Sequence, residues 1–211
     1  MSSATISEPV VREIGIEPMP ETWARMQAFT EERGADDEDQ VWFVEHPPVF
    51  TLGLAADRSH VLNAGDIEVI QTDRGGQVTY HGPGQLVCYV LLDLRRRGIS
   101  IRSLVETLER SVIETMAEYG IEANARRDAP GVYVDGSKIA AVGLRVRRGC
   151  SYHGLAFNIA MDLAPFDLIN PCGFEGLRVT QLSALCDVAA IADVRPVYEK
   201  KLLSLLSEGA D

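Results

Sequence analysis

The chain has 211 residues, a formal net charge of −11, 46% hydrophobic residues and 24% charged residues. A chain of this length and composition can bury a sizeable core, so we expect a single globular catalytic or binding domain over residues 1–211. An acidic chain lacks the basic surface that a nucleic-acid backbone requires, and no segment approaches the ~20 apolar residues that span a bilayer. The composition therefore argues against a nucleic-acid-binding protein and against a membrane protein.

The cysteines and the first residues indicate a compartment. Cys88, Cys150, Cys172 and Cys186 lie far apart and form no C-x-x-C pair, which suits neither a disulfide-stapled secreted protein nor a zinc ribbon. The first residues lack the basic and apolar pattern of an export signal. We therefore expect reduced thiols, no metal site and a cytoplasmic protein.

The first half of the chain predicts a helix followed by strands. Residues 20–34 carry apolar side chains near helical spacing, between a proline that suits a helix start and a glycine that suits a helix end. Residues 40–53 are rich in β-branched and aromatic residues, which favour a strand interrupted at Pro47 and Pro48. The apolar run at 84–94 is typical of a strand that is buried on both faces.

The second half predicts a long helix, a hairpin, a further strand and a closing helix. Apolar residues recur with helical period from Ser100 until Gly120. Residues 130–146 read as two strands around Asp135-Gly136, a favoured two-residue hairpin turn. A strand at 151–163 and a helix at 196–209 complete the pattern. Hairpins with helices between and after them predict an α+β (α/β) fold with a mixed central β-sheet flanked by helices.

A glycine-rich stretch, "RGGQVTYHGPGQLVCY" at 74–89, precedes the buried strand. Its four glycines by Gly84 cannot belong to the interior of a helix or strand, so we expect a tight loop over the edge of the sheet. Missing side chains let a ligand or another backbone come close, and bare N–H groups can face an oxygen atom. Glycines alone would fit a plain connection, but Arg74, Tyr80 and His81 at fixed offsets favour a binding loop.

The run "NPCGFEGLRVTQL" at 170–182 places Cys172 between a proline and a glycine. Neither a helix nor a strand can bury a thiol at such a turn, so we expect Cys172 to be exposed. The other cysteines have simpler interpretations, because Cys88 and Cys186 lie among apolar residues and Cys150 lies in a polar turn. Of the four cysteines, only Cys172 combines expected exposure with a tight turn.

Four segments, in order, resemble the bacterial octanoyltransferases, also called lipoyl(octanoyl) transferases or lipoate-protein ligase B. They are "RGGQVTYHGPGQLVCY", "GSKIAAVGLRV", "HGLAFNI" and "NPCGFEGLRVTQL", and the similarity runs from about residue 41 to 185. The resemblance implies a catalytic domain like that of biotin protein ligases and class II aminoacyl-tRNA synthetases. It implies the first step of lipoate biosynthesis, in which an octanoyl or lipoyl group moves from acyl carrier protein to a lysine. The acceptors would be lipoyl domains of 2-oxoacid dehydrogenase complexes and the glycine cleavage H protein, with no cofactor.

The resemblance also assigns residues. It makes Cys172 the nucleophile that carries the acyl group as a thioester, and Lys138 the neighbour that activates it. The walls of the acyl site would be Arg74, Gly75, Gly76, Gln77, Val78, Thr79, Tyr80, His81, Ala141, Val142, Gly143, Gly154, Leu155 and Ala156. The chemistry agrees, because a free thiol is only a few per cent thiolate at neutral pH and a nearby ammonium raises that fraction. We expect an apolar tunnel whose depth reads chain length, with ~0.8 kcal/mol for each buried methylene.

Two other functions fit parts of the pattern. An ATP-dependent lipoate or biotin protein ligase would share the fold and the glycine-rich loop, but it would form an adenylate and need no thiol. A non-catalytic module that binds acyl carrier or lipoyl domains would leave Cys172 and Lys138 without a purpose. For docking of an acidic carrier, the first candidates are Arg145, Arg147 and Arg148. His153 is expected to be structural, and His81 is left between a structural role and proton transfer.

Overall fold

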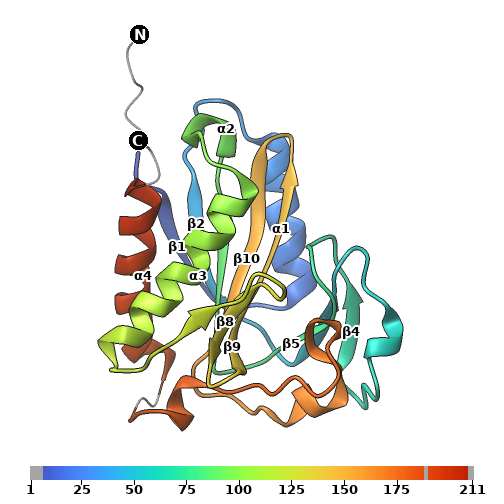
Figure 1. Cartoon of the computed structure of the whole chain (residues 1–211). Helices are drawn as coiled ribbons and strands as arrows, with labels where there is room; N and C mark the ends of the chain where they lie inside the picture. The colour runs from blue at the N-terminus through green and yellow to red at the C-terminus, as the bar shows by residue number, and fades with distance from the viewer. Residues whose placement is uncertain (1–6, 188–189, 209–211) are drawn as a thin grey trace.

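A computed structural model describes residues 7–187 and 190–208, and it describes Cys172 through its backbone only. Within these residues a seven-stranded sheet forms the centre of the molecule (Figure 1). In spatial order its strands are β1 (Val10–Ile16), β2 (Gln40–Glu45), β6 (Gln85–Leu91), β10 (Cys150–Asn158), β9 (Ser137–Arg147), β8 (Gly131–Val134) and β7 (Asn124–Ala125). β1 pairs with β2 in parallel, and each other neighbouring pair is antiparallel. The sheet is therefore mixed, as the sequence predicts.

Helices cover both faces of this sheet. α3 (Ile101–Glu118) and α4 (Ile191–Glu208) pack on one face, and α1 (Met19–Glu32) packs on the other (Figure 1). A short helix, α2 (Leu94–Arg97), follows β6. A second sheet of β4 (Glu68–Gln71), β3 (Val49–Leu52) and β5 (Thr79–His81) lies on the α1 side. Four 3-10 turns complete the described structure: η1 (Arg58–His60), η2 (Ala164–Leu168), η3 (Pro171–Gly173) and η4 (Leu182–Ala184).

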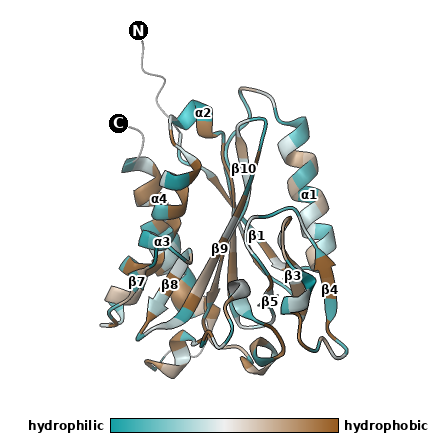
Figure 2. Ribbon diagram, turned by 45° about the vertical axis from the view of Figure 1, so that its right-hand side comes forward, coloured by the Kyte–Doolittle hydropathy of each residue, from teal (hydrophilic) through white to brown (hydrophobic). Residues whose placement is uncertain are grey.

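The helix and strand patterns follow from burial. Ser100 caps α3, because its Oγ accepts a hydrogen bond from the Ser103 backbone N–H at 3.0 Å. The buried apolar side chains of α3 recur at helical spacing. Hydrophobic (brown) and hydrophilic (teal) residues alternate along the helices (Figure 2). Every residue of β6 is buried, because alternate side chains enter the cores on the two faces. The predicted long helix and buried strand are confirmed.

The predicted hairpin and the predicted closing helix are confirmed. Asp135 and Gly136 have φ values of 48° and 76°, which suit a two-residue turn between β8 and β9. α4 includes most of the predicted closing segment but begins earlier, at Ile191, so that Pro196 lies inside the helix.

Other differences concern strands and cysteines. The two halves of the interrupted strand at 40–53 belong to different sheets, and the glycine-rich stretch contains β5. β1, β4 and β7 have no counterpart among the predicted elements. Cys150 is buried as the first residue of β10, because the turn that we expected there ends one residue earlier, and Cys186 is only half-buried. Among the described residues, none of the helices combines the length and apolar composition that crossing a membrane requires.

Candidate functional site

The site begins with small residues on the central strands. On the α1 side of the sheet, two adjacent rows of residues cross three strands. Val87, Ala156 and Ala141 form one row, and Tyr89, Gly154 and Gly143 form the next. Because alanine and glycine have a short side chain or none, they leave a groove over β9 and β10 on this face of the sheet.

The glycine-rich loop covers this groove. The Gly75 backbone N–H donates to the Leu144 carbonyl oxygen at 2.9 Å, which places the loop directly on β9. A Cβ at Gly143 would lie 3.1 Å from the Gly75 carbonyl oxygen and 3.2 Å from Arg74 Cδ. The loop can therefore approach β9 this closely only because Gly143 has no side chain. Arg74 is buried, and its Nη2 donates to the Thr51 carbonyl oxygen at 2.6 Å. The loop is therefore anchored between the two sheets.

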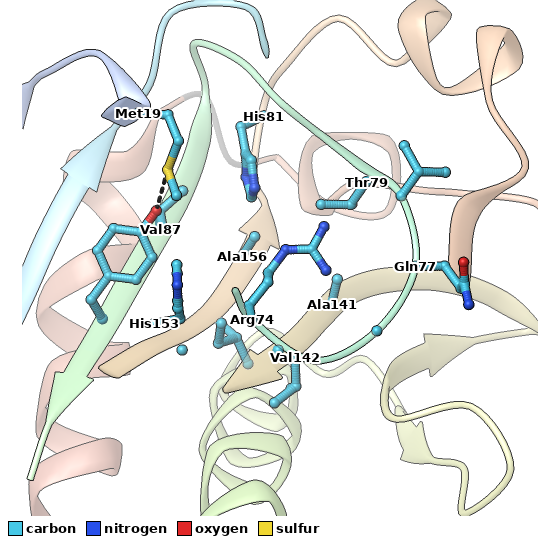
Figure 3. Close-up of a pocket in the computed structure, with 16 residues that line it drawn as sticks. Met19, Arg74, Gln77, Thr79, His81, Val87, Ala141, Val142, His153 and Ala156 are labelled. Atoms are coloured by element: carbon cyan, nitrogen blue, oxygen red, sulfur yellow. Dashed lines mark hydrogen bonds between the residues drawn. The ribbon is translucent and has the colours of Figure 1, made fainter. Parts of the chain in front are cut away.

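Under the loop lies a cavity that is open to solvent at its mouth (Figure 3). Its lining residues are Met19, Arg74, Gly76, Gln77, Val78, Thr79, His81, Val87, Tyr89, Ala141, Val142, Gly143, His153, Gly154, Leu155 and Ala156. Of the predicted wall residues, Gly75 and Tyr80 do not line it. The Tyr80 ring lies instead against Phe50 and Phe166, with ring centroids 5.5 Å away in each case.

Lys138 lies next to one end of this cavity. A second, much smaller cavity is lined by Lys138 and Pro171, among other residues, and it shares Thr79 and Ala141 with the first. The Lys138 side chain is buried, and its Nζ donates to the Pro130 carbonyl oxygen at 3.0 Å. Lys138 Nζ also lies 5.1 Å from the centroid of the Tyr133 ring. These contacts hold the amino group in a fixed place beside the cavity.

The backbone of Cys172 lies at the same end. It belongs to η3, and the Lys138 backbone joins the segment that follows this turn, donating to the Arg178 carbonyl oxygen at 2.8 Å. Gly173 has a φ of 77°, and a Cβ there would lie 3.1 Å from Gln77 Cγ. The structure thus brings the Cys172 turn, Lys138 and the glycine-rich loop together. The expected exposure of the Cys172 thiol concerns a side chain outside the described structure.

The cavity is lined mainly by apolar residues, but polar groups of His153 and Tyr89 lie at its opposite end. His153 is buried there with a φ of 60°, a left-handed conformation that is rare within a strand. This conformation places the His153 and Tyr152 rings on the same face, stacked with centroids 5.2 Å apart. His153 Nε2 lies 2.9 Å from Asp73 Oδ1, and its Nδ1 has no hydrogen-bond partner among the described residues. A structural role for His153 is thus supported, but the ring also faces the cavity.

Asp73 joins this end to α1. Its carboxylate accepts hydrogen bonds from His153, from the Tyr152 hydroxyl and from Trp23 Nε1, the last at 2.9 Å. Burial by itself raises the pKa of the Asp73 carboxyl, but hydrogen bonds from His153 and Tyr152 hold that pKa well below its ordinary value. Burial lowers the pKa of His153 despite this partner. A neutral His153 that donates from Nε2 leaves Nδ1 as an acceptor.

Two further buried histidines surround the same end. His46 Nδ1 lies 2.6 Å from the Glu17 carbonyl oxygen, and His46 Nε2 lies 2.7 Å from the Tyr89 hydroxyl. Burial lowers the pKa of His46 and lowers the pKa of His81 to about 3. Since a carbonyl can only accept, neutral His46 donates from Nδ1 and accepts the Tyr89 hydroxyl proton at Nε2. His81 bonds Gln85 Oε1 at 2.7 Å, so its surroundings favour a structural role.

The sequence did not identify Met19, Val87 and Tyr89 as cavity residues, nor Asp73 and His46 behind them. The position of Asp73, directly before the glycine-rich loop, is the only local signal for any of them. Of the three candidate docking arginines, Arg145 pairs with Tyr152 across β9 and β10, and the other two lie elsewhere. Arg147 and Arg148 both contact Glu31 at the turn between β9 and β10, the opposite end of β9 from Lys138 (Figure 1).

Comparisons with known proteins show the family of the chain. Residues 18–203 match the family model described as the lipoyl protein ligase A/B catalytic domain. The chain is 59% identical to an octanoyltransferase from Alkalilimnicola ehrlichii, over 86% of this chain and 85% of that protein. It is 60% identical to an octanoyltransferase from Pseudomonas fluorescens, over 92% of this chain and 91% of that protein.

Solved structures share the fold. A bipartite lipoate protein ligase from Thermoplasma acidophilum superimposes with a TM-score of 0.76 at 18% identity, covering 94% of this chain and 84% of that chain. The biotin protein ligase from Aquifex aeolicus, solved with biotin and ATP, gives a TM-score of 0.60 at 15% identity, covering 97% of this chain and 71% of that chain. The predicted relationship to ligase catalytic domains is therefore confirmed for the fold. By its sequence, the chain belongs to the octanoyltransferases, enzymes whose catalytic domain is shared with lipoyl protein ligases A and B.

Proposed function

We propose that this enzyme moves an octanoyl group from acyl carrier protein to a lysine of a lipoyl domain, through a thioester on Cys172. Membership of the octanoyltransferase family supports the overall reaction. One observation of the structure supports the covalent route. Lys138 is a buried amine on a cavity that it shares with Pro171, the residue before Cys172.

The first half-reaction uses the thiolate of Cys172. Its sulfur attacks the carbonyl carbon of the carrier thioester, a new carbon–sulfur bond forms, and the carrier sulfur leaves and takes a proton. The Lys138 ammonium, held by the Pro130 carbonyl oxygen, favours the thiolate by its charge. The acyl chain extends from Cys172 into the cavity over Ala141 and Ala156, where ~0.8 kcal/mol for each buried methylene supports binding.

The second half-reaction releases the acyl group. The neutral amine of the acceptor lysine attacks the Cys172 thioester, an amide bond forms, and the cysteine sulfur leaves as a thiolate. The attacking nitrogen loses one proton. Lys138, neutral after giving its own proton to the carrier sulfur, accepts it, and the resulting ammonium faces the cysteine thiolate. The acceptors in this proposal are lipoyl domains of 2-oxoacid dehydrogenase complexes and the glycine cleavage H protein.

Intact mass spectrometry tests the thioester. The wild-type protein, incubated with octanoyl carrier protein, should gain one octanoyl group that hydroxylamine removes. Cys172→Ala should fold but gain none, whereas Cys186→Ala, which removes a half-buried cysteine elsewhere, should behave as wild type. A folded Cys172→Ala protein with normal turnover would refute the covalent route.

The ATP-dependent ligase is the alternative that the shared fold supports. It predicts that free octanoate and ATP are required, and that the carrier thioester is not used. Transfer from octanoyl carrier protein in nucleotide-free buffer distinguishes the two reactions. Strict dependence on ATP would favour the ligase.

A further inference from the structure

We propose that Met19, Tyr89 and His153, the far wall of the cavity, set the length of the acyl chain that the enzyme transfers. The inference rests on the proposed function, because it assumes that the acyl group enters beside Lys138 and extends away from it. It names the residues at which the chain must end.

The direction of the cavity follows from the strand register. Lys138 adjoins the cavity at Thr79 and Ala141. The row of Gly143 and Tyr89 lies two residues further along the strands, or about 7 Å at ~3.3 Å per residue. Figure 3 shows Gln77 and Thr79 on one side of the cavity and Met19 and His153 on the other. An acyl chain that starts at the first end therefore approaches the far wall with its methyl group.

The far wall opposes a longer chain. His153 Nδ1 is a buried acceptor without a hydrogen-bond partner among the described residues, so apolar carbon pressed against it gains no favourable contact. The Tyr89 hydroxyl is fixed by His46 Nε2 at 2.7 Å. A further methylene must displace Met19, whose side chain is almost fully buried.

The wall is also held in place. Asp73 accepts from Trp23 on α1 and from Tyr152 and His153 on β10, so it fixes the first turns of α1 against the strands. Met19 is the first residue of α1. Its position over the groove is therefore set by the same carboxylate that orients the His153 ring.

Met19 is the wall residue that can be shortened without unpairing a buried polar group. The Tyr89 hydroxyl has one proton and two neighbours, His46 Nε2 and Met19 Sδ, the latter at 3.2 Å. Nitrogen is the stronger acceptor, so loss of the sulfur leaves the hydroxyl bonded. Met19→Ala should thus deepen the cavity and leave the hydrogen-bond network intact.

The experiment compares Met19→Ala with Met26→Ala, a matched control on the same helix that is equally buried but does not line the cavity. Each protein receives an equimolar mixture of octanoyl, decanoyl and dodecanoyl carrier proteins, and intact mass spectrometry at early times gives the ratio of the adducts. This ratio does not depend on the fraction of folded protein. If Met19→Ala does not fold, Met19→Val replaces it.

The ratio of decanoyl to octanoyl adduct should rise about tenfold or more in Met19→Ala, because two more methylenes become buried at ~0.8 kcal/mol each. Met26→Ala should keep the wild-type ratio. Equal ratios in the two variants would overturn this inference. Failure of the wild-type protein to form any adduct would instead refute the proposed function.

Discussion

Asp73→Asn tests whether the carboxylate behind the cavity holds α1 and β10 together. Four donors, from Trp23, Gln27, Tyr152 and His153, converge on this carboxylate, whose side chain is 20% exposed. Hydrogen bonds to a charged group contribute ~1.5–3 kcal/mol, and those to a neutral group contribute ~0.5–1.5 kcal/mol. Allowing for the partial exposure, the substitution should lower the free energy of unfolding by about 2–3 kcal/mol at pH 7.

The effect should depend on pH in a defined direction. The pKa of Asp73 is lower in the folded protein than in the unfolded chain, where it is ~3.9. The stabilisation is therefore complete above that unfolded value and is lost as the pH falls towards the folded pKa. Between pH 5 and pH 3 the wild-type protein should lose roughly 1 kcal/mol that the Asn variant does not lose.

Urea denaturation at pH 7, 5 and 3, followed by tryptophan fluorescence, measures this difference. Asp66→Asn, at an exposed aspartate, is the control and should change the free energy of unfolding by less than about 0.5 kcal/mol. The reasoning is refuted if Asp73→Asn is as stable as wild type at pH 7, or if the gap between the two proteins is the same at all three pH values.

Lys138→Ala should slow acylation of Cys172 at pH 7, because the ammonium that favours the thiolate is gone, and raising the pH to 9 should restore part of the rate. Acylation time courses by mass spectrometry measure this, with exposed Lys200→Ala as control, and a defect that does not change with pH would contradict the assigned role. Gly154→Ala should lower the free energy of unfolding by about 3 kcal/mol or more, because its Cβ would lie 2.0 Å from the Cys88 carbonyl oxygen and force β6 and β10 apart. Gly143→Ala should lower the free energy of unfolding by less, because its Cβ would lie 3.1 Å from the Gly75 carbonyl oxygen, but it should raise the KM for octanoyl carrier protein. Thermal denaturation and steady-state kinetics distinguish the two variants. An equal loss of stability in both would argue against the contact between the loop and β9.

Local patterns in the sequence were enough to predict much of the fold. Helical period and the Ser100 cap predict α3, and the pair of left-handed residues at 135 and 136 follows from the sequence Asp-Gly. The division of residues 40–53 between two sheets was not predictable in this way. β2 and β3 are both apolar, so their composition does not distinguish them. Their pairing with β6 and β5 depends on contacts between segments far apart in the chain.

The candidate site, too, could be predicted from the sequence only in part. The glycine-rich loop and the small residues of β9 and β10 are recognisable by type, and the structure places most of them on the cavity. The far wall is built from residues whose sequence surroundings indicate ordinary core. Tyr89 belongs to a uniformly apolar strand, and Met19 begins an ordinary amphipathic helix. The left-handed conformation of His153 has no local signature, because it depends on contacts with Tyr152 and Asp73.

The left-handed conformation of His153 affects what a substitution at this position would do to the stability of the protein. A left-handed residue other than glycine costs of order 1–3 kcal/mol, a strain that a glycine at 153 would relieve. The same replacement would delete the imidazole from the far wall. Selection for heat resistance alone should therefore favour glycine at this position and yield a more stable but less discriminating enzyme. His153 thus combines a strained backbone with an imidazole ring that lines the cavity.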